Sequence, residues 1–304
     1  GQNGQPGNDG QDGDDGNDGQ DGTDGDDGDD GGTALLDILA EPAGANCPNG
    51  GVAIFRGLDE NDDGQLQEGE RDGDAEYICN GAAPVREGDA IVANQDDADA
   101  LDGVDRIEGD LIVIGADIVD LDLRDLTAVE GNIEISSNPG LEGIDLGGLT
   151  RVNGSVDIDD NLGLTDLRLG DLSFVDGYFH LGWAPQLDDV RLGALAHVGD
   201  AFIVSTGSDA ALPATLLPSF VGQDAYIGDN NGLLTFSIVD GSFVGGDFAL
   251  NANPGLVIAR VLDALFVGLD LYVTNNGALN PASADNFAAN ADVGFDTIIG
   301  NNGQ

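Results

Sequence analysis

The sequence contains no methionine and no lysine, and its nine basic side chains are all arginine. Against them stand 58 acidic side chains, which give the 304 residues a formal net charge of −49. Such a charge repels nucleic-acid phosphates and anionic lipid, so we expect neither nucleic acid nor a membrane as a partner. Divalent cations are the favoured partners. Adaptation to a salty medium and heavy use of divalent cations both produce this composition, and composition does not separate them.

Long apolar runs are absent as well. No stretch of about 18 apolar residues occurs, which predicts that no segment inserts into a membrane. The chain begins with glycine, without a basic and apolar leader, so we expect a processed, secreted product. Apolar residues make up 40% of the sequence, enough for two or three domains or for one elongated repeat array.

Cysteine is limited to Cys47 and Cys79, at the two edges of one short segment. This arrangement predicts a single disulfide and an oxidising compartment, extracellular or at the cell surface. A buried pair of free thiols is the alternative.

Residues typical of catalytic sites are scarce. The two histidines, His180 and His197, belong to no Ser-His-Asp, Cys-His or zinc pattern. His180 occupies the position that Glu134 and Asp157 take in the preceding repeats, so we expect it to face solvent beside an acid. Aromatic residues make up only 5% of the chain, few for a polysaccharide-cleaving groove. We therefore expect a protein that is not an enzyme.

A repeat dominates the chain from about residue 100. Short alternating segments such as "GNIEIS" and "GSVDID" each follow a glycine, and these glycines lie 22 to 24 residues apart. They are Gly109, Gly131, Gly154, Gly177, Gly199, Gly222, Gly246 and Gly268. A second apolar series keeps a 23-residue spacing: Leu121, Leu123 and Leu126; Ile144, Leu146 and Leu149; Leu167, Leu169 and Leu172; Val190, Leu192 and Leu195. A constant offset stacks like residues coil upon coil, which predicts a mainly β protein containing a β-solenoid of about 23 residues per coil.

Turns rich in asparagine and glycine separate the two series. The recurring residues are Asn138, Asn161, Asn230 or Asn231, Asn253, and Asn275 or Asn276. Asparagine tolerates left-handed backbone angles, and a buried amide can bond the backbone of neighbouring coils. We expect an asparagine ladder with a structural role, rather than a ligand site.

The order of glycine, short strand, "NPGL" or "NNGL" turn and "LxLxxL" resembles the receptor L domain, a leucine-rich β-helix of insulin-receptor and epidermal-growth-factor-receptor ectodomains. The resemblance covers about residues 104–280 and implies an L-domain-like β-solenoid. Residues 89–103 are then a linker or cap, and residues 281–304 a C-terminal cap and tail. The stretch "NPASADNFAANADV" after the last repeat is the expected end cap.

Between the cysteines lies "DENDDGQLQEGE", which matches a twelve-residue EF-hand calcium loop. The expected Ca²⁺ ligands are Asp59, Asn61, Asp63, the backbone carbonyl of Gln65, and Glu70, with Gly64 at the turn and Gln67 acting through water. These hard oxygens are the donors that Ca²⁺ prefers. A merely solvated acidic turn is the alternative.

The sequence around this loop does not predict flanking helices, and "AEYICNG" is typical of a strand. We therefore expect a structural calcium loop instead of a sensor. The segment "GANCPNGGVAIFRGLDENDDGQLQEGERDGDAEYICNGA" resembles a small cysteine-bracketed calcium module found beside collagen-like repeats in secreted bacterial proteins. We expect the disulfide-stapled calcium-loop module to span residues 33–88. A metal and a disulfide are the reinforcement that so small a core needs.

Residues 1–32 have glycine at every third position from Gly1 to Gly31, as a collagen triple helix requires. Pro6 is the single proline of this tract, which also holds eleven aspartates and no basic residue, so a trimer needs salt or Ca²⁺ to screen repulsion. Disorder and a bundle of extended glycine-rich chains are the alternatives.

These features predict a secreted structural protein, a subunit of an extracellular filament or surface assembly. Self-association through a collagen-like triple-helical stem, as a homotrimer or fibre, is expected. The alternative is a cell-surface adhesin or binding module whose solenoid face recognises carbohydrate or protein, with the stem supplying avidity.

Overall fold

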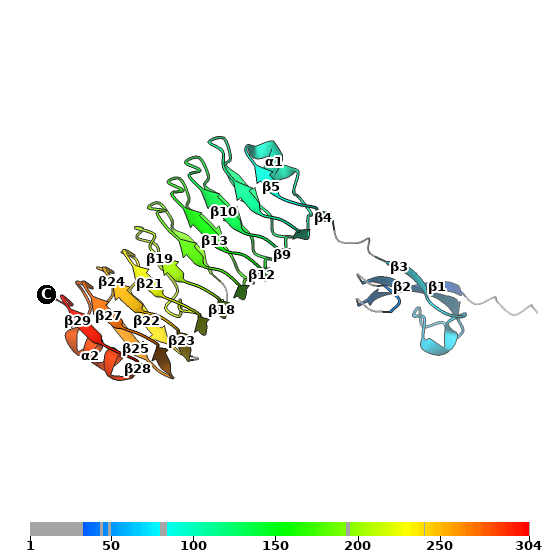
Figure 1. Cartoon of the computed structure of the whole chain (residues 1–304). Helices are drawn as coiled ribbons and strands as arrows, with labels where there is room; N and C mark the ends of the chain where they lie inside the picture. The colour runs from blue at the N-terminus through cyan, green and yellow to red at the C-terminus, as the bar shows by residue number, and fades with distance from the viewer. Residues whose placement is uncertain are drawn as a thin grey trace, which may run out of the picture. The chain divides into compact units, whose positions relative to one another are not determined.

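The computed structural model describes residues 33–42, 45–47, 50–79, 84–192, 195–239 and 241–303. The chain divides between residues 80 and 81 into two compact units, coloured blue to cyan and cyan to red in Figure 1. We call residues 33–79 the N-terminal module and residues 84–303 the solenoid. The collagen-like stem predicted over residues 1–32 lies outside the described residues.

The N-terminal module is built on an antiparallel sheet of three strands in the order β1-β2-β3. These are β1 (Thr33–Glu41), β2 (Gly51–Asp59) and β3 (Glu76–Cys79). β1 and β2 pair along their whole length, from Thr33 opposite Asp59 to Glu41 opposite Gly51. A single 3₁₀ turn, η1 (Glu68–Glu70), lies between β2 and β3. The strand expected at "AEYICNG" is therefore confirmed as β3.

The solenoid has three sides, two of them long parallel sheets of ten strands each. The first long sheet consists of β5 (Ala90–Val92), β7 (Leu111–Val113), β10 (Ile133–Ser136), β13 (Val156–Asp159), β16 (Phe179–Leu181), β19 (Phe202–Val204), β21 (Ala225–Gly228), β24 (Phe248–Asn251), β27 (Leu271–Thr274) and β29 (Thr297–Gly300). The second long sheet consists of β4 (Val85–Arg86), β6 (Arg106–Ile107), β9 (Ala128–Val129), β12 (Arg151–Val152), β15 (Phe174–Val175), β18 (His197–Val198), β20 (Phe220–Val221), β23 (Ser242–Val244), β26 (Leu265–Val267) and β28 (Ala291–Val293).

The third side is discontinuous. Four strands form its first part: β8 (Asp120–Asp122), β11 (Gly143–Asp145), β14 (Asp166–Arg168) and β17 (Asp189–Arg191). After an interruption it resumes with β22 (Thr235–Ile238) and β25 (Ile258–Val261). The short helices α1 (Gln95–Asp99) and α2 (Pro281–Ala289) occupy the place of a third-side strand near the two ends of the solenoid (Figure 1). Neither described helix is long and apolar enough to cross a membrane.

The register confirms a β-solenoid of about nine coils with about 23 residues per coil. Ile133 pairs with Val156, Val156 with Phe179, and Phe179 with Phe202, each one coil further along the chain. The glycines of the repeat precede the strands of the first long sheet, as expected. Because inward-facing side chains fall at the same phase in every coil, their apolar groups stack into one core.

One continuous apolar cluster fills the solenoid from Ala90 to Ala288. The predicted apolar series from Leu121 to Leu192 is buried in it, while Leu195 is partly buried at its edge. Five phenylalanines are fully buried as well: Phe179, Phe202, Phe236, Phe248 and Phe287. Burial on this scale is the main source of stability for such a fold, since each buried large apolar side chain contributes roughly 1.5–3 kcal/mol.

The ladder of strands extends past both ends of the predicted range 104–280. β4 lies within residues 33–88 and β5 within residues 89–103, and both pair with the following coil. At the other end α2 forms inside the stretch expected to be a cap, but the chain continues into β28 and β29. The helix packs against β25 on the third side, so it completes a coil instead of closing the end.

The asparagine ladder is present, and it decides between Asn230 and Asn231 and between Asn275 and Asn276. Asn138, Asn161, Asn230, Asn253 and Asn276 are fully buried, so Asn230 and Asn276, not their neighbours, belong to it. Each bonds the backbone of an adjacent coil: the Asn253 amide donates to the Ile227 carbonyl at 2.9 Å, and its oxygen accepts from the Asn230 backbone N–H at 3.3 Å. Asn302 continues the column. Ala184 interrupts it, and Thr206 follows in the next coil.

Replacing Asn230 with alanine is expected to lower the free energy of unfolding of the solenoid by about 2–4 kcal/mol. The Val204 carbonyl loses the donor that now lies at 2.9 Å, and the Thr206 backbone N–H loses its acceptor at 3.0 Å. Urea denaturation followed by circular dichroism measures the loss. Asn231→Ala is the matched control, because Asn231 is exposed and makes one long bond, 3.4 Å to the Gly207 carbonyl. Equal effects of the two substitutions would contradict a ladder that carries stability.

Candidate functional site

The predicted calcium loop projects from the sheet of the N-terminal module, between β2 and β3. Its base is closed by an antiparallel bridge between Gly57 and Arg71 and by a 2.7 Å hydrogen bond from the Asp72 N–H to the Arg56 carbonyl. The described residues flanking the loop form strands, so the expectation that it has no flanking helices is confirmed. Strand pairing therefore fixes both ends of the loop.

Inside the loop the chain curls around the carboxylate of Asp59, which is buried with 4% of its surface exposed. One carboxylate oxygen accepts the Asp63 N–H at 3.1 Å and the other accepts the Gly64 N–H at 2.8 Å. The curl needs left-handed backbone angles, which occur at Asp62 (φ 57°) and Gly64 (φ 77°). Glycine adopts such angles at little cost, which accounts for its place at the sixth position of the loop.

The remaining predicted ligands surround the same turn. Asn61 Oδ1 accepts the Asp63 N–H at 2.9 Å, and the Gln65 N–H donates to Asp63 Oδ1 at 2.8 Å. Glu70 reaches back across the loop, where its two oxygens accept the N–H groups of Glu60 and Gln67 at 3.2 and 2.9 Å. The structure thus gathers the predicted oxygen donors on one loop.

The carboxylates of this loop accept hydrogen bonds from backbone N–H groups. Across the part of the chain that the structure describes, no three Asp, Glu, His or Cys side chains form a ready metal cluster. The donor types and the curl fit a Ca²⁺ ion, which takes carboxylate, amide and carbonyl oxygens. Each Glu70 oxygen accepts one N–H, which leaves a further lone pair on each oxygen that could bind an ion.

Cys47 and Cys79 form a disulfide, with their Cα atoms 5.1 Å apart. The prediction is confirmed, and the alternative of two free thiols is wrong. The bond joins the segment before β2 to the end of β3, and Cys47 is fully buried. It therefore links both ends of the chain segment that contains the loop.

Arg71 connects the loop to the first strand. Its guanidinium lies 3.9 Å from the centre of the Phe55 ring and donates to Asp37 at 2.8 Å. Both partners are on the sheet face turned toward the loop, because Asp37 and Phe55 are direct cross-strand neighbours. The ion pair is half-buried, where such contacts are stronger than at an exposed surface.

On the solenoid, His180 lies beside an acid as expected. Its Nδ1 is 2.9 Å from Asp157 Oδ1, and the register places Glu134, Asp157 and His180 in one outward column. Burial, aided by the Asp157 carboxylate, raises the pKa of Tyr178, so its hydroxyl stays protonated and donates to Asp157 at 3.4 Å. The column of Glu134, Asp157 and His180 is thus a polar surface patch, and Tyr178 is its aromatic neighbour.

An aromatic stack that was not predicted from the sequence runs along the outside of the second long sheet. Its members are Phe174, His197, Phe220, Phe243 and Phe266, with ring centres 4.6 to 5.5 Å apart and nearly parallel planes. The sequence contains a signal for this stack, because its five aromatic residues are spaced 23 residues apart, which is the length of one coil. Arg151 covers the free face of Phe174, with its guanidinium 4.4 Å from the ring centre.

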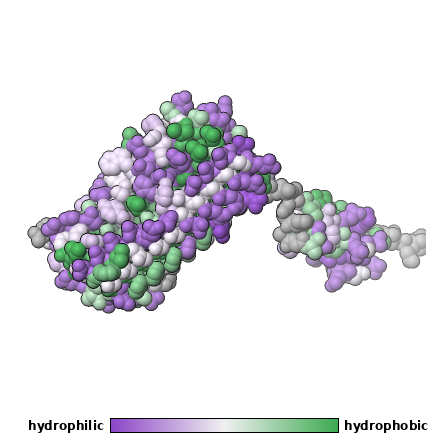
Figure 2. Space-filling model, in the orientation of Figure 1, coloured by the Kyte–Doolittle hydropathy of each residue, from purple (hydrophilic) through white to green (hydrophobic). Residues whose placement is uncertain are grey.

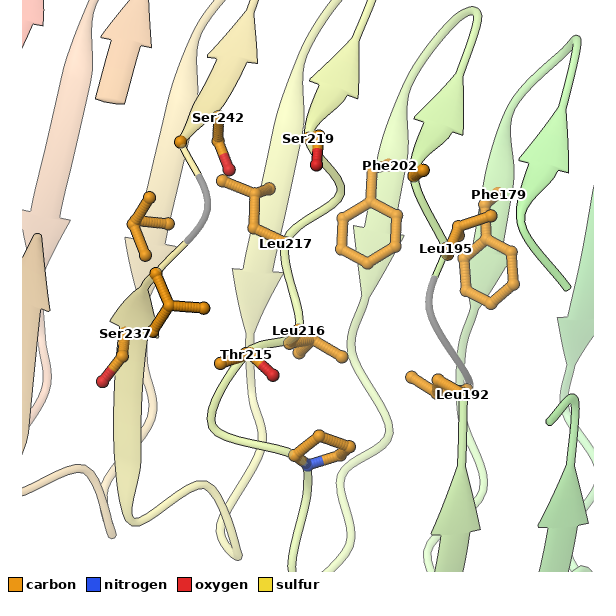
Figure 3. A pocket seen from close by; sticks show the side chains of 15 residues that line it. Phe179, Leu192, Leu195, Phe202, Thr215, Leu216, Leu217, Ser219, Ser237 and Ser242 are labelled. Carbon is orange, nitrogen blue, oxygen red and sulfur yellow. The ribbon is translucent and has the colours of Figure 1, made fainter. Parts of the chain in front are cut away.

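A cavity of about 290 Å³ opens where the third side is interrupted between β17 and β22 (Figure 3). Its walls include Phe179, Phe202 and Leu216, and its polar groups are hydroxyls such as those of Ser219 and Ser242. The described residues around it carry no titratable side chain. Apolar walls with hydroxyl groups offer packing and hydrogen bonds, but no acid–base pair.

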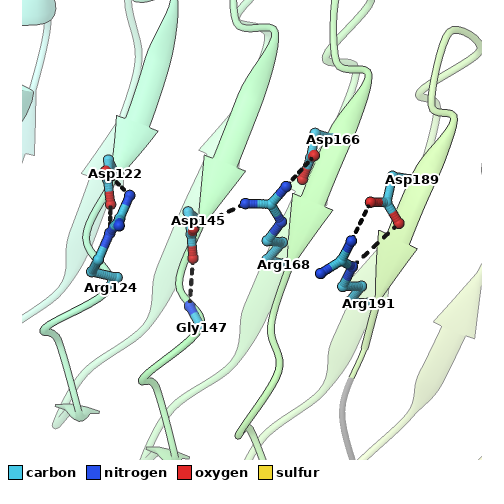
Figure 4. A network of polar contacts seen from close by, with 8 residues as sticks. All are labelled: Asp122, Arg124, Asp145, Gly147, Asp166, Arg168, Asp189 and Arg191. Carbon is cyan, nitrogen blue, oxygen red and sulfur yellow. Dashed lines mark hydrogen bonds and ion pairs between the residues drawn. The ribbon is translucent and has the colours of Figure 1, made fainter.

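A network of aspartates and arginines covers the strands from β8 to β17 (Figure 4). Arg168 bridges two coils, 2.8 Å from Asp166 and 3.4 Å from Asp145, and Arg191 pairs with Asp189 at 2.8 Å. The hydrogen bond from Arg124 lowers the pKa of Asp122 below its ordinary value, so this pair stays charged at lower pH than a free aspartate. These exposed pairs offset like-charge repulsion, with modest energies each.

Residues 34–79 match the model of a family described as a domain of unknown function, DUF7151. The match coincides with the N-terminal module, from the second residue of β1 to Cys79. No curated protein and no solved structure is significantly similar to the chain.

Proposed function

We propose that the protein is a secreted, non-enzymatic structural protein, a subunit of an extracellular filament or surface assembly. Self-association runs through the collagen-like stem of residues 1–32, and the N-terminal module links this stem to an L-domain-like solenoid. The observation that carries the proposal is the continuity of the two parts: β1 begins at Thr33, directly after the glycine register ends. A trimeric stem thus leads straight into a disulfide-bonded module.

Calcium has two roles in this proposal. In the loop, Asp59, Asp63 and Glu70 bind one ion together with Asn61 and the Gln65 carbonyl, which closes the loop over the sheet. In the stem, Ca²⁺ screens the repulsion among the eleven aspartates that each chain contributes. The curl around the buried Asp59 and the position of Gly64 support the first role.

The aromatic stack favours a structural role over the binding-module alternative. Carbohydrate recognition by stacking uses the open face of a ring. Both faces of Phe174, His197, Phe220 and Phe243 are occupied by neighbours in the column or by Arg151. These four rings therefore present their edges, and their main contribution is to hold successive coils together.

Sedimentation and electron microscopy of the full chain, in Ca²⁺ and then in chelator, test the proposal. We expect trimers or fibres in Ca²⁺ and smaller species in chelator. Glu70→Gln removes one ligand charge and should raise the Ca²⁺ concentration needed for assembly by about tenfold. Glu68→Gln is the matched control, because Glu68 is exposed, two residues away and outside the ligand set.

A chain that stays monomeric in both conditions would overturn the filament proposal. Assembly that is unchanged by chelator and by Glu70→Gln would refute the calcium loop, while leaving self-association through the stem in place.

A further inference from the structure

One face of the sheet in the N-terminal module carries apolar side chains that the module itself leaves open. We call Leu36, Ile38, Ile54, Leu58 and Ile78 the module face. The register places them on one side of the sheet, with Ile38 opposite Ile54, Ala34 opposite Leu58, and Val52 opposite Ile78. Leu36, Ile38, Leu58 and Ile78 are between 51% and 69% exposed. Figure 2 shows apolar surface on the module next to strongly hydrophilic surface.

The charge of this face differs from that of the chain as a whole. Its charged side chains are Arg56, opposite Leu36, and Glu76, opposite Ile54, and they pair with each other at 3.0 Å. The face is therefore neutral in a protein of net charge −49. An apolar, neutral patch on so acidic a chain is where copies can approach without repulsion, and contiguous exposed apolar surface marks interaction sites.

The N-terminal module also buries few apolar side chains within its own fold. Its buried apolar residues, among those that the structure describes, are Cys47, Ala53 and Leu66. All three are on the side of the loop and the disulfide, opposite the module face. A domain of fewer than about 50 residues usually needs a disulfide, a metal or association to be stable. Most of the strongly exposed apolar side chains of the sheet lie on the module face, while Leu39 and Tyr77 on the opposite face are 44% and 42% exposed.

The position of the face indicates its occupant. The 32 residues that precede β1 carry the uninterrupted triplet register, and a triple helix holds three chains around one axis. In the proposed stem, three copies of β1 would begin side by side at the end of the triple helix, at high effective concentration. Each module face would then meet the same apolar surface on the other two copies.

We propose that the module face packs against the same face in two further copies of this chain. The N-terminal module is then a trimerisation domain that aligns the three chains of the stem and holds them together. This inference rests on the proposed self-association. It assigns the largest part of the association energy to Leu36, Ile38 and Ile78, because the stem itself has one proline and a strong like charge.

Sedimentation equilibrium of the full chain in Ca²⁺ tests the inference with the double variant Leu36→Glu/Ile38→Glu. We expect the wild type to form trimers. For the variant, we expect the concentration at which half of the chains are assembled to rise by about a hundredfold, since six carboxylates would be buried per trimer. Both residues are exposed in the single chain, so folding should survive, which an intact Cys47–Cys79 disulfide verifies.

Two controls separate the surface from general effects. Ile38→Val keeps an apolar side chain and should leave the trimer intact. Leu262→Glu adds one charge at a solenoid residue that is 62% exposed, and it should not change the mass.

The outcomes distinguish the two proposals. If the wild type is monomeric, self-association and the trimerisation face both fail. If the wild type is trimeric and Leu36→Glu/Ile38→Glu assembles equally well, the face is refuted and the stem alone suffices. If the double variant keeps its mass but unfolds more easily, the face stabilises the single chain and not the association, which also refutes the proposal.

Discussion

Replacing Gly222 with alanine is expected to lower the free energy of unfolding of the solenoid by about 3 kcal/mol or more. A Cβ atom at this position would lie 1.9 Å from the carbonyl oxygen of Gly199 and 2.9 Å from its carbonyl carbon. Both are backbone atoms of the preceding coil, so no side-chain rotation relieves the overlap. The coils would have to separate at this corner and stretch the hydrogen bonds of the two adjoining sheets.

The same contact recurs along the corner, which is why the effect should be general. A Cβ would meet a backbone oxygen at 1.9 Å at Gly199, 2.2 Å at Gly245 and 2.1 Å at Gly268. Four glycines spaced 23 residues apart thus mark the line along which the backbones of these coils approach most closely: Gly199, Gly222, Gly245 and Gly268. A backbone without side chains permits that approach.

Gly277→Ala is the control for this prediction. Gly277 lies in the same unit, and an added Cβ would have no neighbour within 4 Å. Its substitution should change the free energy of unfolding by no more than about 0.5 kcal/mol. Urea denaturation monitored by circular dichroism compares the two, and a Gly222→Ala protein as stable as Gly277→Ala would contradict the close approach of the coils.

Much of the solenoid could be predicted because its signals are periodic. The 23-residue spacing of the glycines and leucines gave the coil length, and the asparagine turns predicted the ladder. The strands of the second long sheet were missed since several, such as Arg151–Val152, are two residues long and too short for an alternating pattern. The place of α2 was missed because a helix with Pro281 at its start reads equally as a cap.

The candidate functional residues were predicted from the sequence only where their pattern is local. The loop from Asp59 to Glu70 could be proposed as a calcium loop because the spacing of its expected ligands is a local pattern. The hydrogen bonds that occupy Glu70 were not, since they depend on how the loop folds back on itself. His197 had no obvious partner in the sequence, although Phe174 and Phe220 are one coil away on either side. The module face requires the pairing register of β1 and β2, which composition cannot supply.

Removing the disulfide with Cys47→Ala/Cys79→Ala is expected to unfold the N-terminal module and leave the solenoid folded. The bond joins residues 32 apart, and a closed loop of that length stabilises by about 3–4 kcal/mol through the entropy of the unfolded chain. That is most of the free energy of unfolding that a small module can have, because this module buries few apolar residues. The solenoid is a separate compact unit with its own apolar core.

Hydrogen exchange followed by mass spectrometry resolves the two units in one experiment. Peptides from β1 to β3 should exchange rapidly in the double variant, and in the wild type under reducing conditions, while peptides from β7 to β27 stay protected. Since the proposed trimerisation face is formed by β1, β2 and β3, we expect the double variant to lose its trimer as well. A module that stays protected without its disulfide would mean that calcium and packing between copies suffice, and that the covalent bond is secondary to them.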